Sequence, residues 1–151
     1  MASRNTFESR SRARRRALQA LYQFRINPRS MSEIIAEFME EQDFSNVDTD
    51  FFKAVCTGVV EHQAALNTAL EDHVDRPVER LDVMEAIILQ MGVFELIHEP
   101  GTPARVVIDE CIDLAHRFGA DGGHAYINGV LDRAARSLRG AELANGGERP
   151  A

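Results

Sequence analysis

The sequence predicts an all-α protein of six or seven helices, and two observations support this class. Apolar residues recur at spacings of three and four along most of the chain, as in amphipathic helices. No stretch alternates strictly between apolar and polar residues, and β-branched residues do not cluster between turn signals, as strands would require. A chain of 151 residues with 44% hydrophobic residues is about one globular domain long and is not mainly disordered.

The first helical pattern starts at Arg12, after residues 1–9, which lack periodicity and are expected to form a flexible basic arm. The apolar side of this helix comprises Ala13, Ala17, Ala20, Leu21 and Phe24. At about 100° per residue, the opposite side comprises Arg12, Arg16, Gln19 and Gln23, with Arg15 beside them. Pro28 ends the helix because proline disfavours the α conformation of the preceding residue. The pattern therefore predicts a row of arginines that projects to solvent.

The middle of the chain predicts a short helix and a long one. Ser32 is the expected N-cap of the short helix, and a turn-rich stretch at residues 43–48 follows it. From Phe52 to Val74 the apolar spacing of three and four persists, which predicts one helix that ends before Pro77.

Three further helices are expected toward the C-terminus. Residues 81–96 are apolar nearly all round, which is typical of a buried central helix. Thr102 is the expected cap of the next helix, with Pro103 in its first position, and Gly119 ends that helix. The last helix reaches Leu138, and residues 140–151 are expected to form a disordered polar tail.

The dipeptide Asn128-Gly129 conflicts with the last helix. It is the strongest two-residue signal for a β-hairpin, yet it lies within a helical apolar pattern. The longer periodicity favours the helix, and Gly129 is then expected where another helix approaches closely.

The charge distribution is strongly asymmetric. Residues 1–29 contain eight arginines and a single acid, Glu8, which gives a local net charge of +7 in a chain of net charge −7. A basic segment on an acidic protein indicates an anionic partner, most often nucleic acid. The alternative is an arm whose charges only keep it soluble.

Catalytic and metal sites are poorly supported. The five histidines and two cysteines form no CxxC or HxxxH pair, so no catalytic residue, metal or cofactor is expected. The glycine-rich loop at residues 119–123 precedes a helix but lacks GxGxxG, and Asp121 would repel a phosphate. We expect this loop to be a flexible rim that an RNA backbone can approach. Cysteines this few indicate a reducing, cytoplasmic compartment, and no signal peptide or membrane span is expected.

Three segments carry a resemblance to a known family. They are SRARRRALQALYQF at residues 11–24, ILQMGVFELIH at 88–98 and PARVVIDECIDLAHRFGADGGHAYINGVLD at 103–132. Together they resemble the NusB family of transcription antitermination factors, over roughly residues 10–139. The resemblance implies one helical domain at 10–139 with two small helical subdomains, of about residues 10–76 and 77–139.

The resemblance also implies a function. Such a protein pairs with NusE, a small-subunit ribosomal protein, binds boxA RNA in ribosomal operon leaders, and joins the RNA polymerase elongation complex to suppress termination. The implied RNA-binding residues, with Gln19 added from the same helix face, are Arg10, Arg12, Arg14, Arg15, Arg16, Gln19 and Tyr126. Glu85 is the expected contact with NusE, on the exposed side of the helix at residues 83–96.

Some residues depart from the family pattern, and alternatives remain. The departures are Gln90 (often arginine), Asp109 (often asparagine), and Gly122 and Gly123 (usually an acid or serine). One alternative is a protein-interaction module. Another is a stand-alone RNA-binding module related to the N-terminal domain of ribosomal RNA cytosine methyltransferases, in a chain expected to end before any catalytic domain. The sequence leaves the oligomeric state open, although a homodimer that covers the arginines is conceivable as a storage form.

Overall fold

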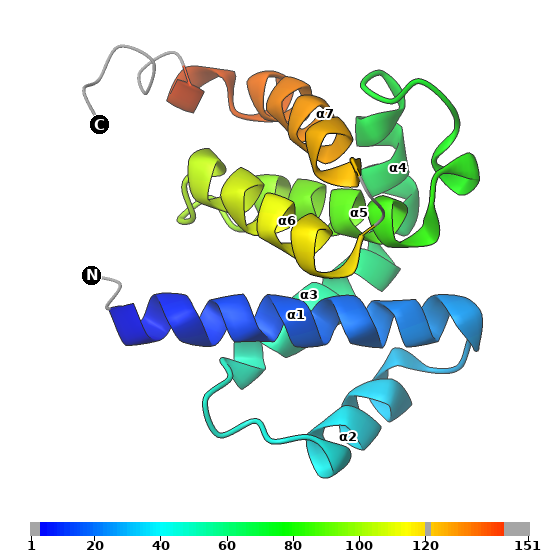
Figure 1. Cartoon of the computed structure of the whole chain (residues 1–151), viewed down its shortest axis with the longest axis vertical. Coiled ribbons are helices and arrows are strands. Elements are labelled where there is room, and N and C mark those ends of the chain that lie inside the picture. The colour runs from blue at the N-terminus through cyan, green and yellow to red at the C-terminus, as the bar shows by residue number, and fades with distance from the viewer. Residues whose placement is uncertain (1–3, 120–121, 144–151) are drawn as a thin grey trace. The chain divides into compact units, whose positions relative to one another are not determined.

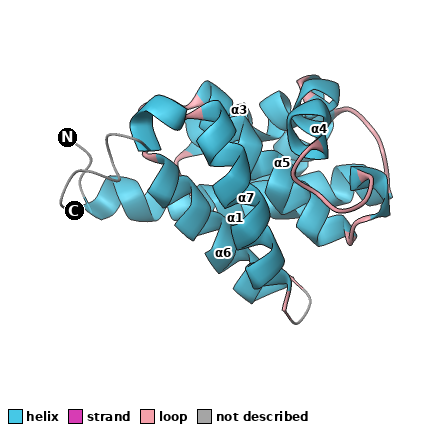
Figure 2. Ribbon diagram, turned by 90° about the horizontal axis from the view of Figure 1, so that it is seen from above, coloured by secondary structure: helices cyan, strands magenta, loops and turns pink. Residues whose placement is uncertain are grey.

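The computed structural model describes residues 4–119 and 122–143, and every regular element within these residues is a helix (Figures 1 and 2). The predicted all-α class is therefore confirmed. The chain divides into two compact units, unit 1 up to His62 and unit 2 from Gln63, and each is described by itself.

Unit 1 contains three helices, α1 (Arg4–Ile26), α2 (Met31–Glu41) and α3 (Thr49–Glu61). The long helix α1 packs against both α2 and α3, and these two pack against each other. Buried side chains from all three helices form the core: Ala13, Ala17, Leu18, Ala20, Leu21, Met31, Ile34, Ile35, Phe51, Phe52, Val55, Cys56 and Val59. The predicted apolar side of the first helix is thus the buried side, except for Phe24, which is only half-buried.

The start of α1 corrects the prediction of a flexible arm at residues 1–9. Residues 4–9 are helical, whereas residues 1–3 lie outside the described part. The backbone N–H of Asp48 donates to the carbonyl of Ser9 at 3.1 Å, and Glu8 pairs with Arg12 one turn later at 3.7 Å. These contacts extend the helix beyond its apolar pattern.

The N-cap of α2 is Ser30 and not Ser32. The Ser30 hydroxyl accepts a hydrogen bond from the backbone N–H of Glu33 at 3.2 Å. Both serines are chemically suitable caps, so sequence alone did not separate them.

The predicted long helix from Phe52 to Val74 is wrong, because the helix breaks at His62. Helix α3 ends at Glu61 and α4 (Gln63–Glu71) begins two residues later. Residues 61–65 are all exposed, so no burial requires a continuous helix there. The division between the units falls at this break, whereas the resemblance implied a boundary near residue 76.

Unit 2 is built around α5 (Val83–His98), which packs against α4, α6 (Ala104–Phe118) and α7 (Gly123–Leu138) (Figure 1). A short 3₁₀ helix, η1 (Val78–Arg80), precedes α5. All eleven residues from Ala86 to Leu96 are buried. The predicted buried central helix is therefore confirmed.

The start of α6 is capped from the far end of unit 2. Its N-cap is Pro103, not the predicted Thr102, and the backbone N–H of Ala104 donates to Glu142 Oε2 at 2.8 Å. Glu142 lies in residues 140–143, which are helical. The prediction of a disordered tail is wrong for these four residues, and residues 144–151 lie outside the described part.

Gly129 is helix interior, as the periodicity predicted, but no other helix approaches it closely among the described residues. A Cβ there would lie 3.4 Å from Arg133 Nη1 of the same helix. The close approach is at Gly92 of α5, where a Cβ would lie 2.9 Å from Leu131 Cδ2 and 3.1 Å from Cys111 Sγ.

Within the described helices, none is long and apolar enough to cross a membrane. The described residues also include no group of three or more histidine, cysteine, aspartate or glutamate side chains that could hold a metal ion. The thiols of Cys56 and Cys111 are buried, and burial raises the pKa of Cys56 far above its ordinary value.

Candidate nucleic-acid interface

Helix α1 presents a row of arginines along one side of unit 1. The side chains of Arg10 and Arg12 are 36% and 37% exposed, and Arg15, Arg16 and Gln19 are half-buried. Arg12, Arg15, Arg16 and Gln19 lie opposite or beside the buried apolar side. Arg10 lies at one end of the apolar side itself, in line with Ala13 and Ala17. Partial exposure lets a guanidinium group meet solvent while its aliphatic stem stays packed.

The arginines are held by the loop between α2 and α3. Arg10 Nε donates to Asp48 Oδ2 at 3.3 Å. Arg12 Nη1 donates to the carbonyl of Asn46, and Arg16 Nη2 to the carbonyl of Asp43, both at 3.3 Å. Each contact uses one part of a guanidinium group that has five N–H donors, so further donors can meet an anion.

Arg14 differs from its neighbours. Arg14 is only 2% exposed, and its guanidinium carbon lies 4.9 Å from the centroid of the Phe51 ring. Arg10 lies over the same ring at 4.6 Å. The resemblance implied that Arg14 contacts RNA, but its side chain is buried against the aromatic ring of Phe51 on α3.

Arg16 sits among both apolar and acidic groups. Its guanidinium carbon is 5.9 Å from the centroid of the Phe44 ring. Hydrogen bonds from Ser45 and, less strongly, the charge of Arg16 hold the pKa of Asp43 below its ordinary value. The Nε atoms of Arg15 and Arg16 are buried and have no hydrogen-bond partner among the described residues.

Tyr126 lies in unit 2, on α7, and its hydroxyl is fixed by one residue. The hydroxyl donates to Asp75 Oδ1 at 3.0 Å and accepts from the backbone N–H of Asp75 at 3.4 Å. Arg76 donates twice to the same carboxylate, from Nε and Nη2, at 3.0 Å each. The Arg76 guanidinium carbon is also 6.0 Å from the centroid of the Tyr126 ring.

These contacts shift the acidities of the cluster. Hydrogen bonds from Arg76 and Tyr126 hold the pKa of Asp75 below its ordinary value, so its carboxylate is charged at neutral pH. Burial and the Asp75 side chain raise the pKa of Tyr126, although the Asp75 backbone N–H opposes this shift. The phenol therefore stays protonated and can donate to Asp75.

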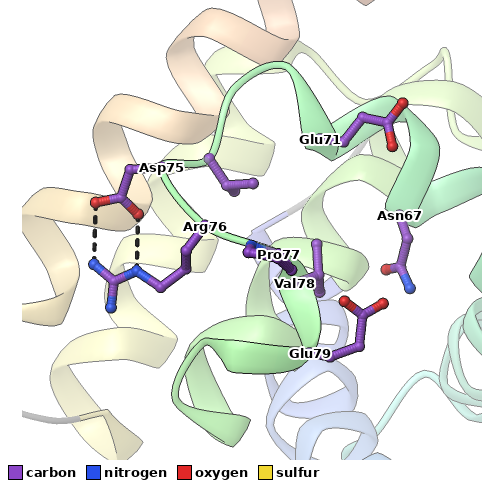
Figure 3. A pocket seen from close by; sticks show the side chains of 8 residues that line it. Asn67, Glu71, Asp75, Arg76, Pro77, Val78 and Glu79 are labelled. Carbon is purple, nitrogen blue, oxygen red and sulfur yellow. Dashed lines mark hydrogen bonds and ion pairs between the residues drawn. The ribbon is translucent and has the colours of Figure 1, made fainter.

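A pocket of about 360 Å³ lies beside this cluster (Figure 3). Its lining consists of Asn67, Glu71, Val74, Asp75, Arg76, Pro77, Val78 and Glu79. Figure 3 shows Asp75 and Arg76 facing each other, joined by both hydrogen bonds. Three carboxylates and one arginine make the pocket a poor receptor for phosphate.

Gln90, a departure from the family pattern, is accounted for in unit 2. It is buried, and its Nε2 donates to Asn67 Oδ1 at 2.9 Å. Asp109 is exposed and pairs with Arg105 at 3.6 Å. Neither residue contributes an unpaired group to the candidate interface.

Glu85, the expected NusE contact, lies against the start of α7. A Cβ on Gly123 would lie 2.5 Å from Glu85 Oε2, so the glycine allows this approach. Burial and the nearby Asp82 raise the pKa of Glu85.

The glycine-rich loop at residues 119–123 is described only in part, because residues 120 and 121 lie outside the described residues. Gly122 has a φ of 82°, a backbone conformation that favours glycine.

Sequence reasoning missed Asp75 and Arg76. Asp75 is the hydrogen-bond partner of Tyr126, 51 positions away in the sequence. No local spacing indicates such a contact, because it depends on how α7 packs beside the segment after α4.

Comparisons with known proteins agree with the resemblance. A family model described as the NusB family matches residues 11–136. The chain is 45% identical to "Transcription antitermination protein NusB" of Xanthomonas axonopodis pv. citri over 133 residues, which cover 88% of this chain and 84% of that protein. Its counterpart in Xylella fastidiosa is also 45% identical, over 134 residues that cover 89% and 85% of the two chains.

Two solved structures are similar as well. T. maritima NusB has a TM-score of 0.79 at 23% identity, covering 95% of this chain and 99% of that chain, which shows the fold. A structure of antitermination factors NusB and NusE in complex with dsRNA contains a chain with a TM-score of 0.77 at 25% identity. That match covers 84% of this chain and 96% of the other.

Proposed function

This chain belongs to the NusB family, and from that membership we propose that it binds boxA RNA of ribosomal operon leaders together with NusE. It is a transcription antitermination factor and not an enzyme. The complex with NusE and RNA then joins elongating RNA polymerase in the cytoplasm and suppresses termination. A similar chain that occurs with NusE and dsRNA supports the choice of both partners.

The arginine face of α1 is the observation that carries this proposal. Its members are Arg12, Arg15, Arg16 and Gln19, which share one side of the helix. Arg10 lies on the other side of α1, where it contacts the same Phe51 ring as Arg14. The loop at residues 43–48 holds the guanidinium groups of Arg12 and Arg16 at fixed positions, so less side-chain entropy is lost when they bind phosphates. Arg14 is left out of this set because it is buried.

Tyr126 of unit 2 is a separate proposed contact with RNA. Unstacked bases of single-stranded RNA stack on aromatic side chains, and each stacked base contributes about 1–3 kcal/mol. Tyr126 is half-buried, so part of its ring is available to a base. We assign phosphate contacts to α1 and a base contact to Tyr126.

Removing three arginines tests the proposal. In the variant R12A/R15A/R16A we expect the affinity for a labelled boxA RNA, measured with purified NusE by fluorescence anisotropy, to fall at least tenfold. The three side chains lie away from the apolar core, so circular dichroism should show unchanged helicity.

A charge-matched control distinguishes the loss of specific RNA contacts from a general loss of positive charge. R105A/R117A/R136A also removes three exposed arginines, all from unit 2. We expect its affinity to stay within about twofold of the unaltered chain. Equal losses in the two triple variants would contradict the proposed site, and NusE binding without any RNA binding would favour a protein-interaction module.

A further inference from the structure

We infer that Asp75 is a positioning residue for RNA binding, which holds the ring of Tyr126 in one orientation through its hydroxyl group. This inference rests on the proposed base contact of Tyr126 and adds a residue that makes no contact with RNA itself. The Asp75 side chain is a carboxylate and would repel a phosphate. Its effect on RNA binding is therefore transmitted through Tyr126.

The hydroxyl of Tyr126 is bound on both sides by the same residue. It donates to the Asp75 carboxylate at 3.0 Å and accepts from the Asp75 backbone N–H at 3.4 Å. A hydroxyl has one donor, and this donor is used. The ring is therefore fixed at its Cβ by α7 and at its far end by Asp75.

Asp75 can act as an anchor because its own segment is held. Arg76 donates two hydrogen bonds to its carboxylate, at 3.0 Å each (Figure 3). Arg133 of α7 donates from Nη2 to the carbonyl of His73 at 2.8 Å, which ties the segment to the helix that carries Tyr126. The Arg76 guanidinium group also lies over the Tyr126 ring at 6.0 Å.

A fixed ring binds a base more tightly than a mobile one. A side chain that must be ordered on binding lowers affinity by about threefold to tenfold. Asp75 orders the ring before RNA arrives, so its loss should weaken binding by this factor even though it removes a negative charge near the RNA.

Two substitutions at one position separate orientation from charge. D75N and D75A remove the same charge, but the asparagine amide oxygen still accepts a hydrogen bond from Tyr126. We expect D75A to bind labelled boxA RNA, with NusE present, about threefold to tenfold more weakly than D75N. In a Y126F background, which lacks the hydroxyl, the two variants should bind equally.

A second measurement reports the orientation without RNA. Carbon-13 labelled tyrosine in a Y22F background gives NMR signals from Tyr126 alone, since the chain has two tyrosines. We expect D75N to keep the ring signals of the unaltered chain and D75A to shift or average them. Unchanged circular dichroism shows that each variant is folded.

The outcomes distinguish the two proposals. Y126A that loses RNA binding, together with equal affinities of D75N and D75A, overturns the role of Asp75 and leaves the proposed function in place. Y126A that binds RNA as the unaltered chain does overturns the base contact itself, and with it this inference. A gap between D75N and D75A that persists in the Y126F background also overturns it, because the effect then bypasses the hydroxyl.

Discussion

Arg139 is the most heavily hydrogen-bonded side chain described in unit 2. Its guanidinium group is buried and donates to the backbone carbonyls of Leu96, Thr102, Glu95 and Glu99, at 2.9, 2.5, 3.1 and 2.9 Å. It also donates to Glu142 Oε1 at 2.9 Å. The last carbonyls of a helix have no partner within the helix, so a cation at this end of α5 satisfies them and interacts favourably with the helix dipole.

Replacing Arg139 by methionine should be strongly destabilising. Methionine keeps most of the apolar length but has no donor, so the carbonyls of Leu96 and Thr102 lose the hydrogen bonds from Arg139. The carbonyls of Glu95 and Glu99 keep the backbone N–H groups of Glu99 and Thr102. We expect the free energy of unfolding, measured with urea, to fall by about 2–4 kcal/mol.

Arg136 provides the control on the same helix. Its side chain is 70% exposed and pairs with Asp132 one turn earlier. R136M should change the free energy of unfolding by less than about 0.5 kcal/mol. A similar loss in both variants would mean that the buried hydrogen bonds of Arg139 contribute nothing beyond a surface ion pair.

At the scale of helices, two glycines in helix interiors differ in their surroundings: Gly92 is packed against other helices, and Gly129 is not. Gly92 lies where α5 meets α6 and α7, and a methyl group there would press on Leu131 and Cys111. Gly129 has only the flexible end of Arg133 nearby. Both positions are helix interior, so intrinsic helix propensity is equal and only packing differs.

Alanine at these two positions should have effects of opposite sign. Gly92→Ala should lower the free energy of unfolding by about 1–3 kcal/mol, because the extra methyl overpacks the core. Gly129→Ala should raise it by up to about 1 kcal/mol, because alanine is the better helix former. The free energy of unfolding of the two variants, measured with urea, tests this. If both substitutions were stabilising, the packing of α5, α6 and α7 around Gly92 would accommodate a methyl group without strain.

Helix ends were the least predictable feature at this scale. The caps Ser30 and Glu142 and the break at His62 replaced the predicted cap residues and the predicted long helix. The apolar pattern locates the buried side of a helix. It does not indicate which distant residues form hydrogen bonds with the N–H and C=O groups at the ends of that helix. Glu142, for example, reaches Ala104 from 38 residues away.

For the whole molecule, the separation of charge is the property that bears most on function. A chain of net charge −7 carries its arginine-rich segment on one helix of unit 1. Acidic residues elsewhere repel the phosphate groups of nucleic acid, so phosphate contacts are favoured along that helix. The affinity for RNA should therefore depend steeply on salt.

The salt dependence gives a count of the engaged arginines. Each phosphate neutralised on single-stranded RNA contributes a slope of about −0.7 in log affinity against log salt. If four arginines engage, the slope should be about −3, measured by anisotropy between low and moderate salt with NusE present. R12A/R15A/R16A should reduce its size by about 2, and a flat dependence in the unaltered chain would exclude phosphate contacts by α1.

Sequence alone determined the helical class, the buried sides of the helices and the family, because each follows from local periodicity or from contiguous motifs. It placed Arg12, Arg15 and Arg16 away from the core, and the structure agrees. Only the tertiary structure decided that Arg14 packs on Phe51 and that Asp75 holds Tyr126. Both depend on which distant side chain a fold brings within a few ångströms, and no spacing along one helix contains that information.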